Sequence, residues 1–131
     1  MLDTDMASYL IKGNRPEVSA AFSIKFPDVC ISSITYAELN YGAMKRKNLS
    51  LIKKVHVFCE LVECMDWNAK AAVNYAKIRA ELEANGSSIG SMDMLTAASA
   101  LATGAILVTN NTAHFSRIKQ LKLDNWCKDL A

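Results

Sequence analysis

The sequence predicts an α/β fold of three layers, in which helices cover both faces of a mainly parallel central sheet of about five strands. Short apolar runs that favour β-structure alternate along the chain with segments of helical periodicity. Three short acidic motifs, at residues 2–5, 35–38 and 91–93, stand where we expect strands to pass into helices. Such βαβ units connect through right-handed crossovers and build a parallel sheet between two layers of helices.

In the amino-terminal half, the first strand is expected to be unusually short, because only Met1 and Leu2 precede Asp3. The elements expected next are a strand over residues 29–33, helices over 36–46 and 52–62, and an extended segment over 61–66.

In the carboxyl-terminal half, Asn68 is a good N-cap for a long helix that ends at Asn85-Gly86. That helix carries Ala72, Val73, Ala76 and Ala80 on one apolar face. The elements expected next are a polar loop over 87–91, an alanine-rich helix that Gly104 ends, a continuous apolar strand over 105–108 and a last short strand near 121–123.

A length of 131 residues suits one hydrophobic core, so we expect a single domain over residues 1–131. The net charge of +2 is too small to indicate nucleic acid binding by itself. The one obvious basic cluster consists of Lys45, Arg46, Lys47, Lys53 and Lys54. It is either a solvated helix-loop-helix surface or a local phosphate-binding patch.

No apolar stretch approaches the length of a membrane span, and acidic residues interrupt the amino terminus. We therefore expect a soluble, cytoplasmic protein. The four cysteines lack CxxC spacing, so we expect reduced and mostly buried thiols. A zinc site built from His56, Cys59 and Cys64 is the alternative.

Asp3, Glu38 and Asp93 are the candidate catalytic and metal-binding residues. In an open parallel sheet, the carboxyl ends of the strands face one crevice, where these acids can converge. Two unit charges about 4 Å apart repel by about 4 kcal/mol at an effective dielectric constant near 20, so such a cluster takes up protons or a cation. Oxygen ligands favour Mg²⁺ over zinc, and a bound magnesium ion can activate water for attack on a phosphodiester.

Two of these acids also have purely structural explanations. Glu38 stands three residues after Thr35 and can be the second member of a capping box. Asp93 can complement the dipole in the first turn of its helix.

In these motifs, the chain resembles the PIN-domain ribonucleases and, among them, the VapC toxins of bacterial toxin-antitoxin pairs. The matching stretches are residues 2–5, 31–39, 78–82, 90–93 and 107–111, with Phe115 after them. The resemblance covers nearly the whole chain and implies an endoribonuclease that depends on Mg²⁺ or Mn²⁺. It also implies a homodimer that a VapB-like antitoxin inhibits. Asp3, Glu38 and Asp93 would bind the metal, and Thr4 and Thr109 would support them by hydrogen bonding.

The chain departs from the family pattern after its fourth strand, where Asn110-Asn111 replaces a fourth acid. A second metal would lose a negative ligand there, although Asn111 can hydrogen-bond a metal-bound water or form an ordinary turn. Expected contacts with RNA or antitoxin are Arg79, Lys77, Lys45 and Arg46.

Closeness to the enterobacterial VapC proteins suggests a structured tRNA as the substrate. Two alternatives remain open at this stage. The spacing of Asp3 and Asp5 is also that of the nucleophile motif in phosphatases that resemble haloacid dehalogenases. A degenerate PIN-like module that only binds RNA or a partner is the other.

Overall fold

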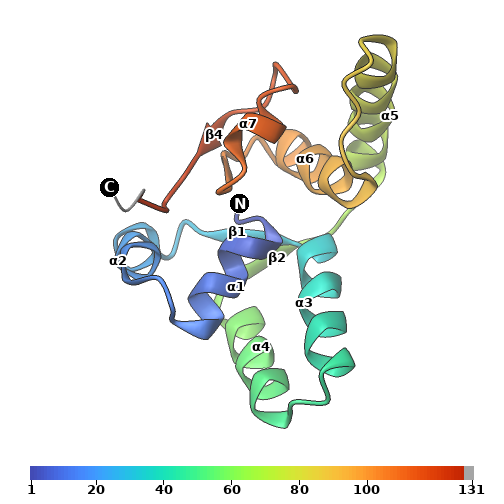
Figure 1. Cartoon of the computed structure of the whole chain (residues 1–131). Coiled ribbons are helices and arrows are strands. Elements are labelled where there is room, and N and C mark those ends of the chain that lie inside the picture. The colour runs from blue at the N-terminus through green and yellow to red at the C-terminus, as the bar shows by residue number, and fades with distance from the viewer. Residues whose placement is uncertain (129–131) are drawn as a thin grey trace.

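The computed structural model describes residues 1–128, and in this range it contains seven helices and four strands (Figure 1). They are α1 (Thr4–Lys12), α2 (Pro16–Lys25), β1 (Cys30–Ser32), α3 (Ser33–Lys45), α4 (Leu49–Leu61), β2 (Glu63–Met65), α5 (Ala69–Ala84), α6 (Ser91–Thr103), β3 (Leu107–Val108), α7 (Thr112–Phe115) and β4 (Leu123–Asp124). None of these helices is both long and apolar enough to cross a bilayer.

The strands form parallel pairs, β1 with β2 and β3 with β4, and the start of the chain joins the two pairs. Leu2 bridges to Ile31 on one side and to Val108 on the other, both in parallel. Its amide donates to the Cys30 carbonyl at 2.9 Å, and the Asp3 amide donates to the Val108 carbonyl at 3.1 Å. The prediction of a mainly parallel sheet with a very short first strand is therefore confirmed.

Helices pack on both faces of the sheet, as the three-layer prediction requires (Figure 1). Neighbouring strand residues point to opposite faces. Leu107 joins one core with residues of α5, α6 and α7, whereas Val108 joins a second core with residues of α1 to α4. Met1 and Leu2 divide between the two cores in the same way. The central segment is therefore buried on both sides, and its end is held rigidly.

Two predictions about helix starts are wrong. Helix α3 begins at Ser33, three residues earlier than expected, because the Ser32 hydroxyl accepts a hydrogen bond from the Ile34 amide at 3.1 Å. Thr35 lies inside the helix, so Glu38 is not the second member of a capping box. Helix α6 follows α5 and a loop rather than a strand, so Asp93 does not stand at a strand-to-helix junction.

The buried face of α5 also differs from the predicted one. Asn68 does cap the helix, since its side chain accepts from the Ala71 amide at 3.1 Å. The buried residues are Ala71, Ile78 and Leu82, which pack with residues of α6. The predicted face, Ala72, Val73, Ala76 and Ala80, is exposed.

Candidate active site

The fold brings four carboxylates to the lining of one small cavity of about 100 Å³. The lining residues are Asp3, Thr4, Asp5, Glu38, Asp93 and Thr96. They come from the end of the central sheet segment and from α1, α3 and α6. In the part of the chain that the structure describes, neither Asp3, Asp5 nor Glu38 forms a salt bridge, so the cavity carries concentrated negative charge.

Asp3 is the most buried of these acids, with 9% of its surface exposed. It is the N-cap of α1, and its Oδ1 accepts from the Met6 amide at 2.9 Å. Burial raises the pKa of the Asp3 carboxyl to about 6, and the nearby charges of Asp5 and Asp93 act in the same direction. Hydrogen bonds from the Thr109 side chain and the Met6 amide oppose this rise in pKa. A neighbouring cation would relieve the cost of its negative charge.

Glu38 is held by a hydroxyl network between α1 and α3. The Thr4 Oγ1 atom donates to Glu38 Oε1 at 2.7 Å and lies 3.3 Å from the Oγ1 atom of buried Thr35. Thr4 follows Asp3 directly, so one short segment fixes both acids. The hydroxyls that sequence reasoning assigned a supporting part, Thr4 and Thr109, thus contact Glu38 and Asp3.

Asp93 has a partner that sequence reasoning missed. Its Oδ2 lies 3.0 Å from Nε2 of His114, which belongs to α7 and comes 21 residues later in the chain. The side chain of Asp93 is 47% exposed and that of His114 is 23% exposed. His114 lies inside α7, after the end of β3 at Val108, and nothing in its sequence context indicated a contact with Asp93.

The donor set suits a hard cation that keeps part of its water shell. Among residues 1–128, no three His, Cys, Asp or Glu side chains stand close enough together to hold a metal ion as a closed cage. Mg²⁺ does not require such a cage, because it binds through one or two carboxylates together with waters and substrate phosphate. Three further carboxylates and two threonine hydroxyls around a partly desolvated Asp3 fit that mode of binding.

Structural zinc does require a closed set of ligands, so the alternative built from His56, Cys59 and Cys64 is wrong. His56 pairs instead with Glu60 at 3.1 Å. Burial raises the pKa of the Cys59 thiol to about 11, so this sulfur is a poor metal ligand. The cysteines are free, as expected, but Cys64 is exposed and the other three are only partly buried.

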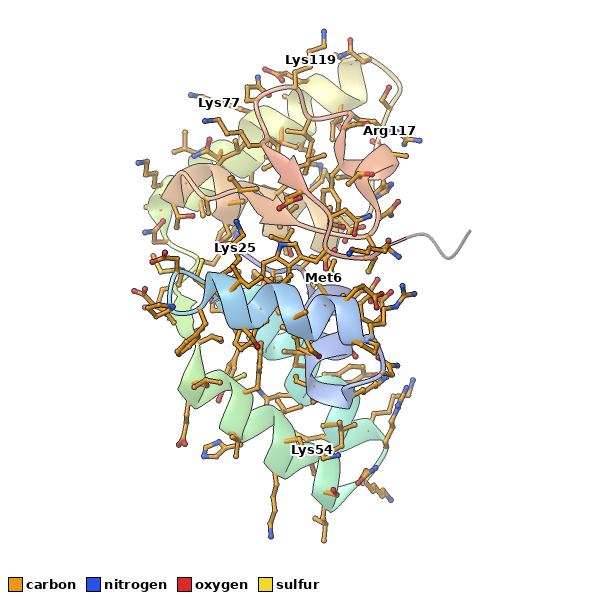
Figure 2. All side chains as sticks on the ribbon, turned by 90° about the vertical axis from the view of Figure 1, so that its left-hand side faces the viewer. Met6, Lys25, Lys54, Lys77, Arg117 and Lys119 are labelled. Carbon is orange, nitrogen blue, oxygen red and sulfur yellow. The ribbon has the colours of Figure 1, made fainter. Side chains whose placement is uncertain are left out.

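The remaining predicted site residues lie at different distances from the cavity. Asn111 is exposed and not part of the lining, although its amide donates to Thr109 Oγ1 at 3.0 Å. Arg79 binds Glu83 and Tyr75 on its own helix α5. Lys77 is also on α5 and lies at the opposite end of the molecule from Lys54 on α4 (Figure 2). Neither residue of α5 is brought to the acidic cavity.

Of the two basic residues predicted at the end of α3, only Arg46 faces a cavity connected with the acids. Lys45 lies against Tyr41, with Nζ 5.9 Å from the ring centre. Arg46 lines a cavity of about 250 Å³ whose lining shares Thr4, Asp5 and Glu38 with the acidic one.

A larger apolar groove of about 510 Å³ lies between α1, α2 and α4. Its apolar lining consists of Leu10, Ile11, Phe22, Val57, Phe58 and Leu61, and Lys53 and Lys54 complete one side. Val57 is 63% exposed and Leu61 is 52% exposed. Exposure of this much apolar surface is typical of a protein-binding site.

A family profile described as PIN domain matches residues 1–121. The tRNA(fMet)-specific endonuclease VapC of Salmonella typhimurium is 35% identical over 131 residues, which cover 97% of each chain. Ribonuclease VapC2 of Rickettsia felis is 39% identical over 131 residues, which cover 98% of each chain.

Solved structures give the same result. The fold resembles a chain in the crystal structure of VapBC2 from Rickettsia felis bound to a DNA fragment from their promoter. The two chains are 37% identical, superpose with a TM-score of 0.90, and are covered to 96% and 97% respectively. None of these relatives favours the phosphatase alternative.

Proposed function

The chain belongs to the PIN-domain family, with VapC ribonucleases as its relatives, and on that premise we propose that it is a metal-dependent endoribonuclease toxin. The observation that supports this most strongly is the group of four carboxylates around one cavity, with Asp3 almost fully buried. Retaining this desolvated charge costs stability, which is typical of a catalytic site.

The cofactor we propose is Mg²⁺, with Mn²⁺ as a substitute, bound by one or two of the carboxylates of Asp3, Glu38 and Asp93 together with water and substrate phosphate. When bound, the ion would lower the pKa of a water molecule that it binds and would neutralise the negative charge that develops on the phosphodiester oxygens. The chain's own part is to orient these acids. The Met6 amide and Thr109 hold Asp3, Thr4 holds Glu38, and His114 holds one oxygen of Asp93.

The substrate class we propose is tRNA, because the Salmonella relative is a tRNA(fMet)-specific endonuclease. A degenerate module that only binds RNA is the alternative that Asn111 leaves open. Cleavage of purified RNA in the presence of Mg²⁺ separates these two functions.

The decisive experiment compares wild type with Asp3→Asn on a tRNA mixture, with and without a chelator. Asn keeps the oxygen that caps α1 but removes the charge. Asp28→Asn is the matched control, because Asp28 is exposed and lines a different cavity. We expect cleavage by wild type and the control with Mg²⁺, and none by Asp3→Asn. Equal cleavage by all three would refute the proposal.

We also propose a VapB-like antitoxin as the partner of a homodimeric toxin, since the similar structures are of VapBC proteins. The apolar groove with Lys53 and Lys54 at its side suits an amphipathic segment that carries acidic residues. Val57→Asp should weaken copurification of the antitoxin. The control Val73→Asp alters a residue of similar exposure on α5, and equal loss with both variants would argue against the groove.

A further inference from the structure

Gly42 lies in α3 without any steric or conformational need for glycine. It has no positive φ, unlike Gly13, Gly86 and Gly104. A Cβ atom built at this position would meet no heavy atom within 4 Å. A helix is less stable with glycine in its interior than with alanine, so Gly42 weakens α3 and no packing contact explains it. The open space beside it therefore needs another explanation.

That space is the cavity of about 250 Å³ that adjoins the carboxylates. It begins at Thr4, Asp5 and Glu38, which also line the acidic cavity. It continues past Gly42 to two cations, Lys12 and Arg46. The cavity therefore connects negative charge at one end with positive charge at the other.

The charges follow the course of two helices. Thr4 and Lys12 stand eight residues apart on α1, and Glu38 and Arg46 stand eight residues apart at α3 and its C-cap. At 1.5 Å per residue, each pair spans roughly 12 Å. A nucleic acid strand advances at least about 3.4 Å per nucleotide, and more when it is extended, so this distance holds at most about three nucleotides. Within residues 1–128, neither Lys12 nor Arg46 forms an ion pair.

We propose that this channel, which α1 and α3 form together with Leu51 and Val55 of α4, holds the RNA strand next to the scissile phosphate. The sugar-phosphate backbone passes close to Gly42, which has no side chain, and Lys12 and Arg46 bind a phosphate within about three nucleotides of the carboxylates. The inference rests on the proposed ribonuclease function and adds the path of the substrate. RNA fits this channel better than a peptide does, because an RNA strand carries a phosphate at each end of the channel. One phosphate would lie at the acids with their cation, and the other at the two basic residues.

The test is RNA binding, measured by anisotropy with a labelled single-stranded RNA in an Asp3→Asn background that prevents cleavage. Gly42→Leu fills the channel and should weaken binding about tenfold while the melting temperature stays equal or rises. Lys12→Met with Arg46→Met should reduce the slope of log affinity against log salt concentration by about 0.7 for each lost phosphate contact. Ala80→Leu, an exposed substitution of similar size on α5, is the control and should leave binding unchanged.

Unchanged RNA binding by Gly42→Leu, or no binding by the Asp3→Asn protein, would overturn the proposal. Weakened antitoxin binding by Gly42→Leu with intact RNA binding would also overturn it and would assign the channel to the antitoxin. A different result is that Gly42→Leu weakens RNA binding but the wild-type protein cleaves no RNA. That result would contradict the ribonuclease function and would still support the proposed path of the RNA.

Discussion

The two sides of the acidic cavity differ in how the chain holds its carboxylates. Asp3 extends from the middle of the sheet, is 9% exposed, and accepts hydrogen bonds from the Met6 amide and Thr109. Asp93 stands in the first turn of α6, is about half exposed, and contacts His114. One side is therefore buried and held by two hydrogen bonds, and the other is about half exposed and held by a single side chain. We infer that Asp3 fixes where a cation can sit, whereas Asp93 is free to adjust to it.

The largest difference between the two sides should appear on neutralising each acid. Asp3→Asn should lower RNA cleavage by at least about a hundredfold. It should also raise the free energy of unfolding without metal at pH 7 by about 3 kcal/mol, because a pKa shifted from 3.8 to about 6 is unfavourable once the group ionises. Asp93→Asn should lower cleavage without a comparable gain in stability. Denaturant unfolding in a chelator measures this contrast, and equal stabilisation by both variants would contradict it.

The same difference predicts a pH dependence that belongs to Asp3. Its folded pKa is raised, so the folded protein binds the proton more tightly than the unfolded chain does. Proton binding at Asp3 therefore stabilises the folded state fully below pH 4, and this stabilisation is lost as the pH rises to about 6 and beyond. Without metal, the difference in stability between wild type and Asp3→Asn should grow from pH 4 to pH 7. A constant difference over this range would show that Asp3 is not desolvated.

Adding Mg²⁺ should reduce the contrast by stabilising the ionised form of Asp3. A ligand present at ten times its dissociation constant stabilises the folded state by about 1.4 kcal/mol. The melting temperature of wild type should rise accordingly at pH 7.5, and that of Asp3→Asn should rise less. Ca²⁺ provides a comparison with a larger ion, and an equal rise in both proteins would place the cation elsewhere.

The smallest expected effect concerns the more exposed side of the cavity. His114→Ala should change the free energy of unfolding by less than about 1 kcal/mol, because the pair with Asp93 is partly exposed. Affinity for Mn²⁺ should nevertheless fall by about tenfold, since Asp93 loses the group that orients it. His114→Gln retains a donor and should recover part of this affinity in a calorimetric titration. Equal affinity in wild type and His114→Ala would mean that the contact is incidental.

Much of the fold could be predicted because its signals are local. Asn68 caps α5 through its own side chain, and Gly104 ends α6 with a φ of 69°. The exposed face of α5 could not be predicted in this way, because alanine is small enough to suit either a buried or an exposed position. The pairing of Asp93 with His114 could not be predicted either, since it depends on how α6 and α7 are placed against each other.

The joining of the two strand pairs through Leu2 has a consequence for how the protein acquires activity. The segment that completes the sheet precedes both of its neighbours in the chain, since Ile31 and Val108 follow it by many residues. Closing these distant contacts carries the entropy cost of long loops, so we expect the sheet to be completed late in folding. Asp3 is aligned only when that step occurs. A partly synthesised or partly folded chain should therefore lack the aligned acids on which the proposed activity depends.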